Sequence, residues 1–479
     1  MTLDSRARWL ALWVLCLGDL MIVLDGTIVN VALPSIRDDL GFSQTSLAWV
    51  VNAYLLTFGG FLLLGGRLGD LFGQRRMFLV GIGLFTAASL ACGLATSQGQ
   101  LVAARAIQGL GGALVAAVAL SLVMTLFTEQ SERAKAMGIF GFVLSGGGVA
   151  GVLLGGVLTD VLNWHWIFLV NIPVGALVFF LSLRLLPPAP AAAESPRLDV
   201  AGAVTVTASL MLAVYAIVNG NETGWATGQT LGLLAGSLVL LVAFLVIETR
   251  ISSPLVPLGL FRNRNVASAN SIGVLMAAGM FAYFFFSALY LQQVLGYTPL
   301  EVGLAYLPSM VIWGASSLYS DKLVMRFGIK APLVTGLGLM ALSLILFART
   351  PVDGSFALDV LPATIAVGLG AGIAFNPILL AAMSGVAPQE AGLASGVVNT
   401  SFMMGGALGL AILASLADSR TTNLVDGGTD ALAALNSGYH VAFLVGAIFT
   451  VASAVLAGLL LKPAPAPAHG YEPEPVGEG

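Results

Sequence analysis

The stretch Gly-Gly-Arg-Leu-Gly-Asp-Leu-Phe-Gly-Gln-Arg-Arg (residues 65–76) separates two long apolar runs, near residues 48–66 and 77–96. Gly73 permits a tight turn with positive φ. Arg67, Arg75 and Arg76 mark one side of a membrane, because Lys and Arg collect at the cytoplasmic ends of spanning helices. The stretch therefore predicts a short cytoplasmic connection between two membrane-spanning helices.

Composition extends this reading to the whole chain. Of 479 residues, 58% are hydrophobic and only 9% are charged, which a protein with a hydrated surface would not tolerate. A hydrocarbon core of ~30 Å needs about 20 mainly apolar residues per helix, and such runs recur from Trp9 to Leu461. We expect an all-α polytopic membrane protein. The net charge of −4 is dispersed rather than gathered in a patch, so nucleic-acid binding is not indicated.

Breaks at Pro, Gly and charged clusters divide the chain into 14 transmembrane helices. A first set of six lies within residues 1–186, a pair within a linker at 187–264, a second set of six within 265–462, and a disordered tail at 463–479. The expected spans lie near residues 10–33, 48–66, 77–96, 101–126, 135–158, 166–186, 199–219, 229–249, 266–291, 302–319, 331–349, 358–384, 393–416 and 439–461.

The distribution of basic residues tests this map. With both termini cytoplasmic, all of the 20 Lys and Arg fall on the cytoplasmic side except Arg37, Arg105, Arg349 and Arg420. Removing one span would place the basic residues of the second half outside. We therefore expect a multi-pass protein of the plasma (inner) membrane with an even number of spans.

Six spans, an inserted pair and six more spans indicate two related bundles, an arrangement common in secondary transporters. The loop at residues 322–330 weakly repeats the loop at 65–76: Gly328 aligns with Gly73 and Phe327 with Phe72, but Met325 stands opposite Asp70. The two halves thus favour a transporter that alternates access around a site near the midplane.

Several motifs in order resemble the major facilitator superfamily. They are the loop at 65–76, the run Leu-Asp-Gly-Thr-Ile-Val-Asn-Val-Ala-Leu-Pro at 24–34, Arg-Ala-Ile-Gln-Gly at 105–109, a Gly-rich fifth span, and Trp-His-Trp-Ile-Phe-Leu-Val-Asn-Ile-Pro-Val-Gly at 164–175. With the inserted pair, they are similar to the fourteen-span drug:proton antiporters over about residues 8–462. This resemblance implies export of hydrophobic or amphiphilic drugs and antibiotics, driven by the proton gradient, with no cofactor and no metal. Val152 and His165 depart from the family pattern, which has Pro and usually Arg there.

Asp25 is the first candidate for proton coupling. A charged carboxylate in a span costs at least ~2.5–3.5 kcal/mol, so it must face a cavity, find a partner or hold a proton. Arg105 lies at a similar depth in its own span, and the resemblance links it to proton movement; a static salt bridge between spans is the alternative. Asp19, six residues before Asp25, either continues a proton path or contacts a polar group in a neighbouring helix.

Glycines and charged residues suggest two further features, a contact between the bundles and a tightly packed fifth span. We expect a conformational latch between the bundles at Gly66, Asp70, Gly73, Arg75 and Arg76, although a loop that only fixes orientation is the alternative. In the fifth span the spacing of four lets a neighbouring helix approach closely, and the resemblance adds a role against leakage. The glycines concerned are Gly147, Gly151, Gly155 and Gly156.

Aromatic and amide side chains in spans near the midplane are the candidates for a substrate cavity. A mainly apolar cavity with few fixed polar groups suits varied hydrophobic solutes, although single aromatic residues in spans more often face lipid or pack. The candidates are Asn52, Tyr54, Phe58, Phe281, Tyr283, Tyr290, Gln292, Gln293 and Asn376.

Other function classes fit less well. The chain has no Gly-Lys dipeptide and hence no P-loop for ATP. An intramembrane enzyme would need a nucleophile and base or a metal cluster, yet the three His are scattered. The sequence shows neither a selectivity filter nor a ring of charged side chains, so it gives no support for a channel. Cys16 and Cys92 read as small packing residues. A dedicated exporter or importer of one metabolite remains the alternative within transport.

Overall fold

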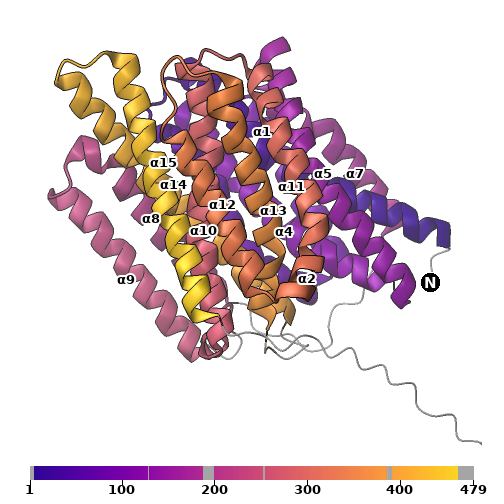
Figure 1. Cartoon of the computed structure of the whole chain (residues 1–479). Coiled ribbons are helices and arrows are strands. Elements are labelled where there is room, and N and C mark those ends of the chain that lie inside the picture. The colour runs from indigo at the N-terminus through magenta and orange to yellow at the C-terminus, as the bar shows by residue number, and fades with distance from the viewer. Residues whose placement is uncertain are drawn as a thin grey trace, which may run out of the picture.

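The computed structural model describes residues 5–127, 129–186, 199–251, 254–384, 386 and 391–461, and within them every regular element is helical. Figure 1 shows long helices running roughly side by side. The long helices are α1 (Ser5–Leu40), α2 (Trp49–Phe72), α3 (Gln74–Gly93), α4 (Gln98–Leu126), α5 (Gln130–Val161), α7 (Asn171–Leu185), α8 (Val200–Thr223), α9 (Gly228–Arg250), α10 (Arg264–Leu289), α11 (Pro299–Phe327), α12 (Lys330–Phe347), α13 (Leu361–Met383), α14 (Ala391–Asp426) and α15 (Ala431–Leu460). Short elements are η1 (Ser46–Ala48), α6 (Trp166–Leu169), η2 (Leu258–Arg262), η3 (Tyr290–Val294) and η4 (Phe356–Val360).

Each expected span falls on one of these helices, with α6 and α7 sharing the sixth, but the count of fourteen is not confirmed. Twelve helices among the described residues are long and apolar enough to cross a membrane. The two that do not qualify are α5, of which only Ala150–Val161 registers as a shorter apolar helix, and α11. Both are long, at 32 and 29 residues. Helix α11 carries no charge between Glu301 and Asp321, but the Gly, Pro, Ser, Trp and Tyr residues of that stretch lower its mean hydropathy.

Glycine pairs bring the third and fourth long helices of each half of the chain close together in the same way. In the first bundle α3 meets α4 at Gly81 and Gly111, where a Cβ on either residue would lie 3.0 Å from the other's carbonyl oxygen. In the second bundle α12 meets α13 at Gly336 and Gly370, where the same distance is 2.6 Å. Small residues allow helix backbones to approach closely where no hydrophobic force drives association. The third and fourth helices of both bundles thus share one mode of packing.

The two bundles meet through α5 against α11, α2 against α14, and α1 against α10. A Cβ on Gly156 of α5 would lie 2.7 Å from the Pro299 carbonyl oxygen of α11, and one on Gly59 of α2 would lie 2.9 Å from Cβ of Met403 on α14. The second helix of each bundle therefore packs on the fifth helix of the other, as a pseudo-two-fold arrangement requires.

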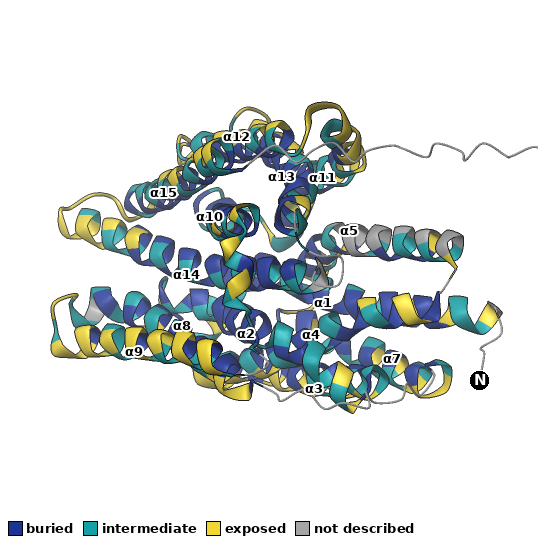
Figure 2. Cartoon of the chain, turned by 90° about the horizontal axis from the view of Figure 1, so that it is seen from below, coloured by how far each residue is buried: buried dark blue, intermediate teal, exposed yellow. Residues whose placement is uncertain are grey.

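The inserted pair α8 and α9 lies at one edge of the molecule (Figure 1). Helix α8 packs on α2 and α14: Thr207 occupies the space beside Gly60, and the Asn221 amide donates to the Ser415 carbonyl oxygen at 2.7 Å. Helix α9 is exposed along much of its length (Figure 2), and only 11% of its most apolar window is buried. Apolar exposure of this kind suits contact with lipid.

The loop residues Gly41 and Gly73 lie at opposite ends of the long helices. At the Gly41 end, the amide of Gln98 donates to the Gly41 carbonyl oxygen and the indole of Trp164 donates to Asp39. At the opposite, Gly73 end, Arg264 donates to the Leu460 carbonyl oxygen. The linker at 187–198 and the tail at 463–479 lie outside the described residues.

Candidate functional site

A buried polar network centres on Asp25, whose side chain is fully inaccessible. Its carboxylate forms an ion pair with Arg105 Nη1 of α4. It also accepts hydrogen bonds from Gln108 Nε2 at 2.7 Å and from Asn171 Nδ2 of α7 at 3.2 Å. The structure therefore brings together Asp25 and Arg105, which the sequence placed at similar depths, and adds two amide donors.

Arg105 is held on all sides. Its Nε donates to the Val50 carbonyl oxygen of α2 at 3.0 Å, and its Nη1 also donates to Gln108 Oε1 at 2.6 Å. The guanidinium carbon lies 4.4 Å from the ring centroid of Tyr54 and 5.6 Å from that of Phe168, distances suited to cation–π contact. Five helices thus converge on one ion pair, which a low-dielectric interior tolerates only when every charge is partnered.

Three members of this network were not site candidates from sequence. Gln108 follows Arg105 by three residues and so lies on the same face of α4. Asn171 begins α7, and Ser89 Oγ of α3 accepts from Gln108 Nε2 at 2.7 Å. The sequence did mark two of them, because Gln108 and Asn171 lie in the motifs at 105–109 and 164–175, and polar residues within apolar spans are costly.

Asp19 does not join the network. Its side chain is 6% exposed, and it makes no hydrogen bond or ion pair with any residue in the described part of the chain. Asp25 is thus partnered by three donors and Asp19 by none.

The glycines of α5 lie where close packing was expected. A Cβ on Gly147 would lie 2.6 Å from Leu20, one on Gly151 2.0 Å from Thr27 Oγ1, and one on Gly155 2.8 Å from the Ile28 carbonyl oxygen. These three glycines face α1, whereas Gly156 faces α11. One face of α5 therefore packs closely on α1 within the first bundle, and an adjacent face packs closely on α11 of the second bundle.

The expected latch residues do not connect the bundles in this structure. Gly73, with φ of +92°, is the single residue between α2 and α3. Asp70 is exposed and makes no hydrogen bond or ion pair within the described residues, and Gly66 borders open space. Arg75 donates to the Leu183 carbonyl oxygen of α7 in its own bundle, and Arg76 is exposed.

The substrate-cavity candidates occupy different places rather than one cavity. Asn52, Tyr54 and Phe58 are buried on α2, with the last two rings stacked at 5.7 Å. Tyr283 is buried inside the second bundle against Tyr306 and Phe347, and Asn376 is half-buried on α13. Three others lie at the Gly41 end: Tyr290 donates to the Pro351 carbonyl oxygen at 2.8 Å, Gln292 donates to the Val31 carbonyl oxygen at 2.8 Å, and Gln293 accepts from Tyr439 at 2.8 Å.

A run of aromatic rings crosses four helices of the second bundle. Phe281 of α10 lies 6.2 Å from Phe402 of α14, which lies 6.0 Å from Phe375 of α13, which lies 6.4 Å from Trp313 of α11. Trp313 points away from the exposed face of α11, because it follows exposed Val311 by two residues, or roughly 200° around the helix. Only Phe281 of this run was a candidate from sequence, since spacing along one chain does not show which spans meet.

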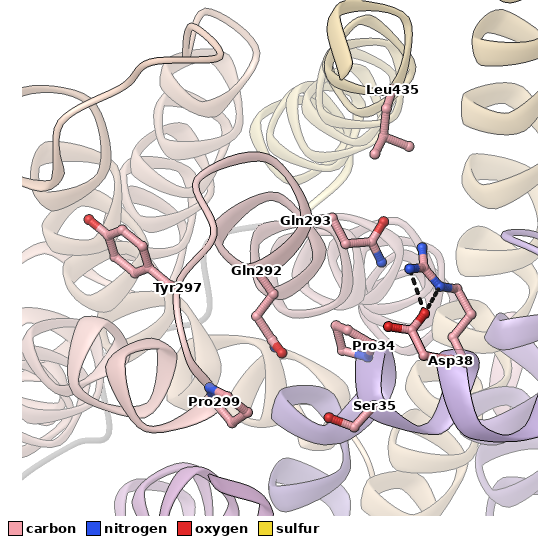
Figure 3. Close-up of a pocket in the computed structure, with 9 residues that line it drawn as sticks. Pro34, Ser35, Asp38, Gln292, Gln293, Tyr297, Pro299 and Leu435 are labelled. Carbon is pink, nitrogen blue, oxygen red and sulfur yellow. Dashed lines mark hydrogen bonds and ion pairs between the residues drawn. The ribbon is translucent and has the colours of Figure 1, made fainter. Parts of the chain in front are cut away.

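A polar pocket of about 390 Å³ opens at the Gly41 end between the bundles. Figure 3 shows Gln292 and Gln293 on one side of the pocket, with Pro34, Ser35 and Asp38 of α1 on the other. Arg37 donates to Asp38 at 2.7 Å. The lining residues are Pro34, Ser35, Arg37, Asp38, Gln292, Gln293, Tyr297, Pro299 and Leu435.

Hydrogen bonds between the two bundles also lie at the Gly41 end. Gln44 Nε2 donates to Tyr439 Oη, and Gln292 Nε2 donates to the Val31 carbonyl oxygen, both at 2.8 Å. At the Gly73 end, the described residues show apolar contact instead, such as Leu63 against Gly396. The bundles are therefore fastened by polar contacts at one end.

The two departures from the family pattern have distinct surroundings. His165 stacks on Trp164 with centroids 3.8 Å apart, and its Nε2 lies 3.8 Å from Asp39 Oδ2. Val152 is buried, and its carbonyl oxygen lies 3.0 Å from where a Cβ on Gly303 would be. Helix α5 runs without a break past this residue.

Little in the described residues suggests metal or thiol chemistry. Within the described ranges, no group of three or more His, Cys, Asp or Glu side chains gathers as metal ligands would. Cys16 and Cys92 are free and buried. The Cys92 thiol lies 3.6 Å from Gln108 Oε1, at the edge of the Asp25 network.

Comparison with known proteins agrees with this architecture. Residues 15–410 match the model of the Major Facilitator Superfamily. The chain is 41% identical to the puromycin resistance protein pur8 of Streptomyces alboniger, covering 96% of this chain and 92% of that protein. It is 39% identical to the cephamycin export protein CmcT of Amycolatopsis lactamdurans, covering 94% and 92%.

A solved structure shares the fold at low identity. The bacterial homolog of the human lysosomal transporter Spinster, in an inward-facing and unoccupied conformation, matches with a TM-score of 0.67 and 17% identity, covering 97% of this chain and all of that one. The expected all-helical fold and the resemblance to this superfamily are therefore confirmed. The chain is a multi-pass membrane transporter that belongs to the Major Facilitator Superfamily.

Proposed function

We propose that this protein exports hydrophobic or amphiphilic antibiotics and drugs from the cytoplasm. The observation that carries the proposal is similarity along nearly the full chain to relatives described as resistance and export proteins, for puromycin, cephamycin and, at 37% identity, lincomycin. The aromatic run from Phe281 to Trp313 offers ring faces on which apolar solutes can stack.

Export is driven by the proton gradient in this proposal. Asp25 and Arg105 form the buried ion pair at the centre of the first bundle, and a proton delivered to Asp25 would cancel the attraction between them. The released Arg105 would still hold α2 through the Val50 carbonyl oxygen, while the bond from Asn171 of α7 to Asp25 would weaken. Protonation would in this way become a change in helix packing, which is what coupling requires.

The proposed topology has fourteen spans, with α5 and α11 crossing the membrane as well as the twelve apolar helices. Helices of 32 and 29 residues are long enough, since a span needs about 20. Helix α5 packs on α1 and α11, and the stretch of α11 between Glu301 and Asp321 carries no charged residue. The Gly73 end is cytoplasmic, as are both termini, and the protein resides in the plasma membrane.

The structure corresponds, on this topology, to a state closed to the outside. Hydrogen bonds from Gln44 to Tyr439 and from Gln292 to Val31 fasten the external end, while Asp70 at the cytoplasmic end has no partner among the described residues. Alternating access would exchange these contacts: the external bonds open as Asp70 engages the opposite bundle.

Substrate-dependent proton flux in proteoliposomes tests the function. We expect that a pH gradient drives uptake of an antibiotic such as puromycin into inverted vesicles, and that adding the antibiotic dissipates the gradient. Transport without proton movement would refute the coupling, and absence of transport across a panel of chemically different antibiotics would refute drug export.

A dedicated exporter of one compound is the second candidate. Several relatives are described by a single antibiotic, namely puromycin, cephamycin and lincomycin. The number of compounds transported from the same panel distinguishes the two functions. One transported compound supports the dedicated exporter, and many unrelated compounds support multidrug efflux.

A further inference from the structure

Two buried acidic side chains meet at the Gly73 end of the inserted pair. Asp199 is the residue that precedes α8, and Glu248 lies in the last turn of α9; the two are 3% and 4% exposed. Helices α8 and α9 pack side by side (Figure 1), and the two carboxyl groups lie within hydrogen-bonding reach of each other. The proposed transport mechanism uses neither residue.

Asp199 is held in place by the first turn of α8. Its Oδ1 accepts a hydrogen bond from the Gly202 backbone amide at 2.7 Å and so caps the helix. A Cβ on Gly202 would lie 2.3 Å from Asp199 Oδ2, so the carboxyl group can lie over this turn because Gly202 has no side chain. Asp199 Oδ2 is buried and accepts from no described donor.

Glu248 connects α9 to the chain that leads to the second bundle. Its Oε2 accepts a hydrogen bond from the Val256 backbone amide at 3.1 Å, whereas its Oε1 is buried and accepts from no described donor. Leu255, beside Val256, forms a small apolar cluster with Leu64 of α2 and Ala203 of α8. The end of α9, the start of α8 and the segment 254–257 therefore meet at this carboxyl pair.

No described cation neutralises the pair. The ionisable group that acts on the charge of Glu248 is Asp199. At this end of α2, α9 and η2, the basic residues Arg67, Arg250 and Arg262 form no ion pair with either carboxyl group. Helix α14 also packs on α8, but its Asp418 lies at the far end, beside Asn221.

Two carboxyl groups in contact do not both ionise in a buried place, because their like charges repel. A proton held between them forms an O–H···O⁻ hydrogen bond, which is short and strong. The two oxygens that lack other donors, Asp199 Oδ2 and Glu248 Oε1, are the atoms available for it.

We propose that Asp199 and Glu248 form a proton-binding site in which one shared proton holds the end of α9 against the start of α8. With the proton, one carboxyl group donates to the carboxylate of the other. When the proton passes to water, two adjacent negative charges remain, and α9 separates from α8 together with the segment that Glu248 binds. On the proposed topology this end is cytoplasmic, so the attachment of the inserted pair weakens as the cytoplasmic pH rises.

The distance between α8 and α9 is the first test, measured with spin labels at the exposed positions Ala201 and Thr249 of the full-length protein in detergent. In the wild type, a change from mildly acidic to mildly alkaline buffer should shift the distances to longer values. Glu248→Gln should show no shift, because its amide donates to Asp199 at any pH. Asp199→Asn should behave in the same way, since Asn also caps a helix.

Asp321→Asn is the matched control, because it removes an exposed acid of α11 at the same end of the molecule. It should shift as the wild type does. An equal shift in the wild type and in both single variants of the pair, or no shift in any of them, overturns the proposal. If one of these variants does not fold, the other gives the result.

Infrared difference spectroscopy detects the proton itself. In neutral buffer, the wild type should show one carboxylic acid C=O band that is lost in Glu248→Gln and in Asp199→Asn but kept in Asp321→Asn. Retention of this band in both single variants overturns the shared proton. Distances that respond to sodium at constant pH, with no acid band lost, would assign a metal cation and also overturn it. Neither measurement needs a transported compound, so a failure of drug export leaves both results decisive.

Discussion

Tyr439 of α15 accepts a hydrogen bond from Gln44, which belongs to the other bundle, and donates one to Gln293 of η3, with both distances 2.8 Å. A single phenol therefore joins the first bundle to the turn that follows α10. Its ring is fully buried against Phe286. A residue placed in this way favours the arrangement in which the Gly41 end is closed.

Tyr439→Phe should shift the protein toward the state that is open at the Gly41 end. Losing a hydrogen bond of this kind costs ~0.5–1.5 kcal/mol, so the ratio of open to closed molecules should rise about two- to tenfold. Distances between spin labels placed at the Gly41 ends of α1 and α15 would measure the ratio. Tyr297→Phe is the control, because no hydrogen bond of the Tyr297 hydroxyl is seen among the described residues. An unchanged distance distribution for Tyr439→Phe would contradict the assignment.

Asp25→Asn should abolish proton-driven export while leaving membrane insertion intact. The substitution removes both the ionisable group and the partner of Arg105, and breaking a buried pair typically costs ~3–5 kcal/mol. Thermal unfolding should therefore shift downward. Export in inverted vesicles and melting temperature in detergent are the two measurements.

The double variant Asp25→Asn/Arg105→Gln separates stability from coupling. It removes the orphaned charge, so the melting temperature should recover in part while export stays absent. Normal export by either variant would refute the coupling role given to Asp25.

Gly151→Ala should destabilise the contact between α1 and α5. The added methyl group would lie 2.0 Å from Thr27 Oγ1 and 3.1 Å from the Leu24 carbonyl oxygen, so the helices must separate, at a cost of ~1–3 kcal/mol. Gly148→Ala provides a matched control one turn away, since its methyl group would meet only Met310 Sδ at 3.9 Å. A lower melting temperature and faster proton leak are expected for Gly151→Ala alone. Equal behaviour of the two variants would argue against a sealed α1–α5 interface.

Asp70→Asn should impair transport without lowering the stability of the state described here. The carboxylate is exposed and has no described partner in this state, so removing its charge costs nothing measurable. If Asp70 engages the opposite bundle in the outward-open state, the variant should spend less time open at the Gly41 end. Accessibility of a cysteine introduced at Ser35, in the pocket at that end, would report the change. If the variant shows both wild-type accessibility at residue 35 and wild-type export, the loop at 65–76 only fixes the orientation of the protein in the membrane.

The sequence was most informative about features that depend only on the position of a residue along its own helix. Asp25 and Arg105 could be paired because residue counts give depth, and the spacing of Gly147, Gly151 and Gly155 gives a helix face. The sequence could not show which spans become neighbours. Asn171 completes the network from α7, while Tyr283, chosen as a cavity residue, is buried among Tyr306, Phe284 and Phe347.

Some predicted boundaries were too short for a related reason. Helix α14 continues to Asp426 and α15 begins at Ala431, well beyond the apolar runs near 393–416 and 439–461. Contacts between helices, such as Thr421 Oγ1 donating toward the Ala434 carbonyl oxygen, extend helical structure past the hydrophobic core. Hydropathy predicts which residues lie in the lipid, and it does not detect these contacts between helices.

The connection between α2 and α3 has a mechanical consequence. Only Gly73 separates Phe72 from Gln74, so the link has almost no slack, and its positive φ resists replacement by any other residue. Because α2 packs on α14 and α8 while α3 packs on α4 and α7, displacing α2 at the interface must carry α3 with it. The one-residue connection therefore favours movement of α2 and α3 together as a rigid unit, and under the proposed coupling a change at Asp25 would be passed on by helix packing rather than absorbed by a flexible loop.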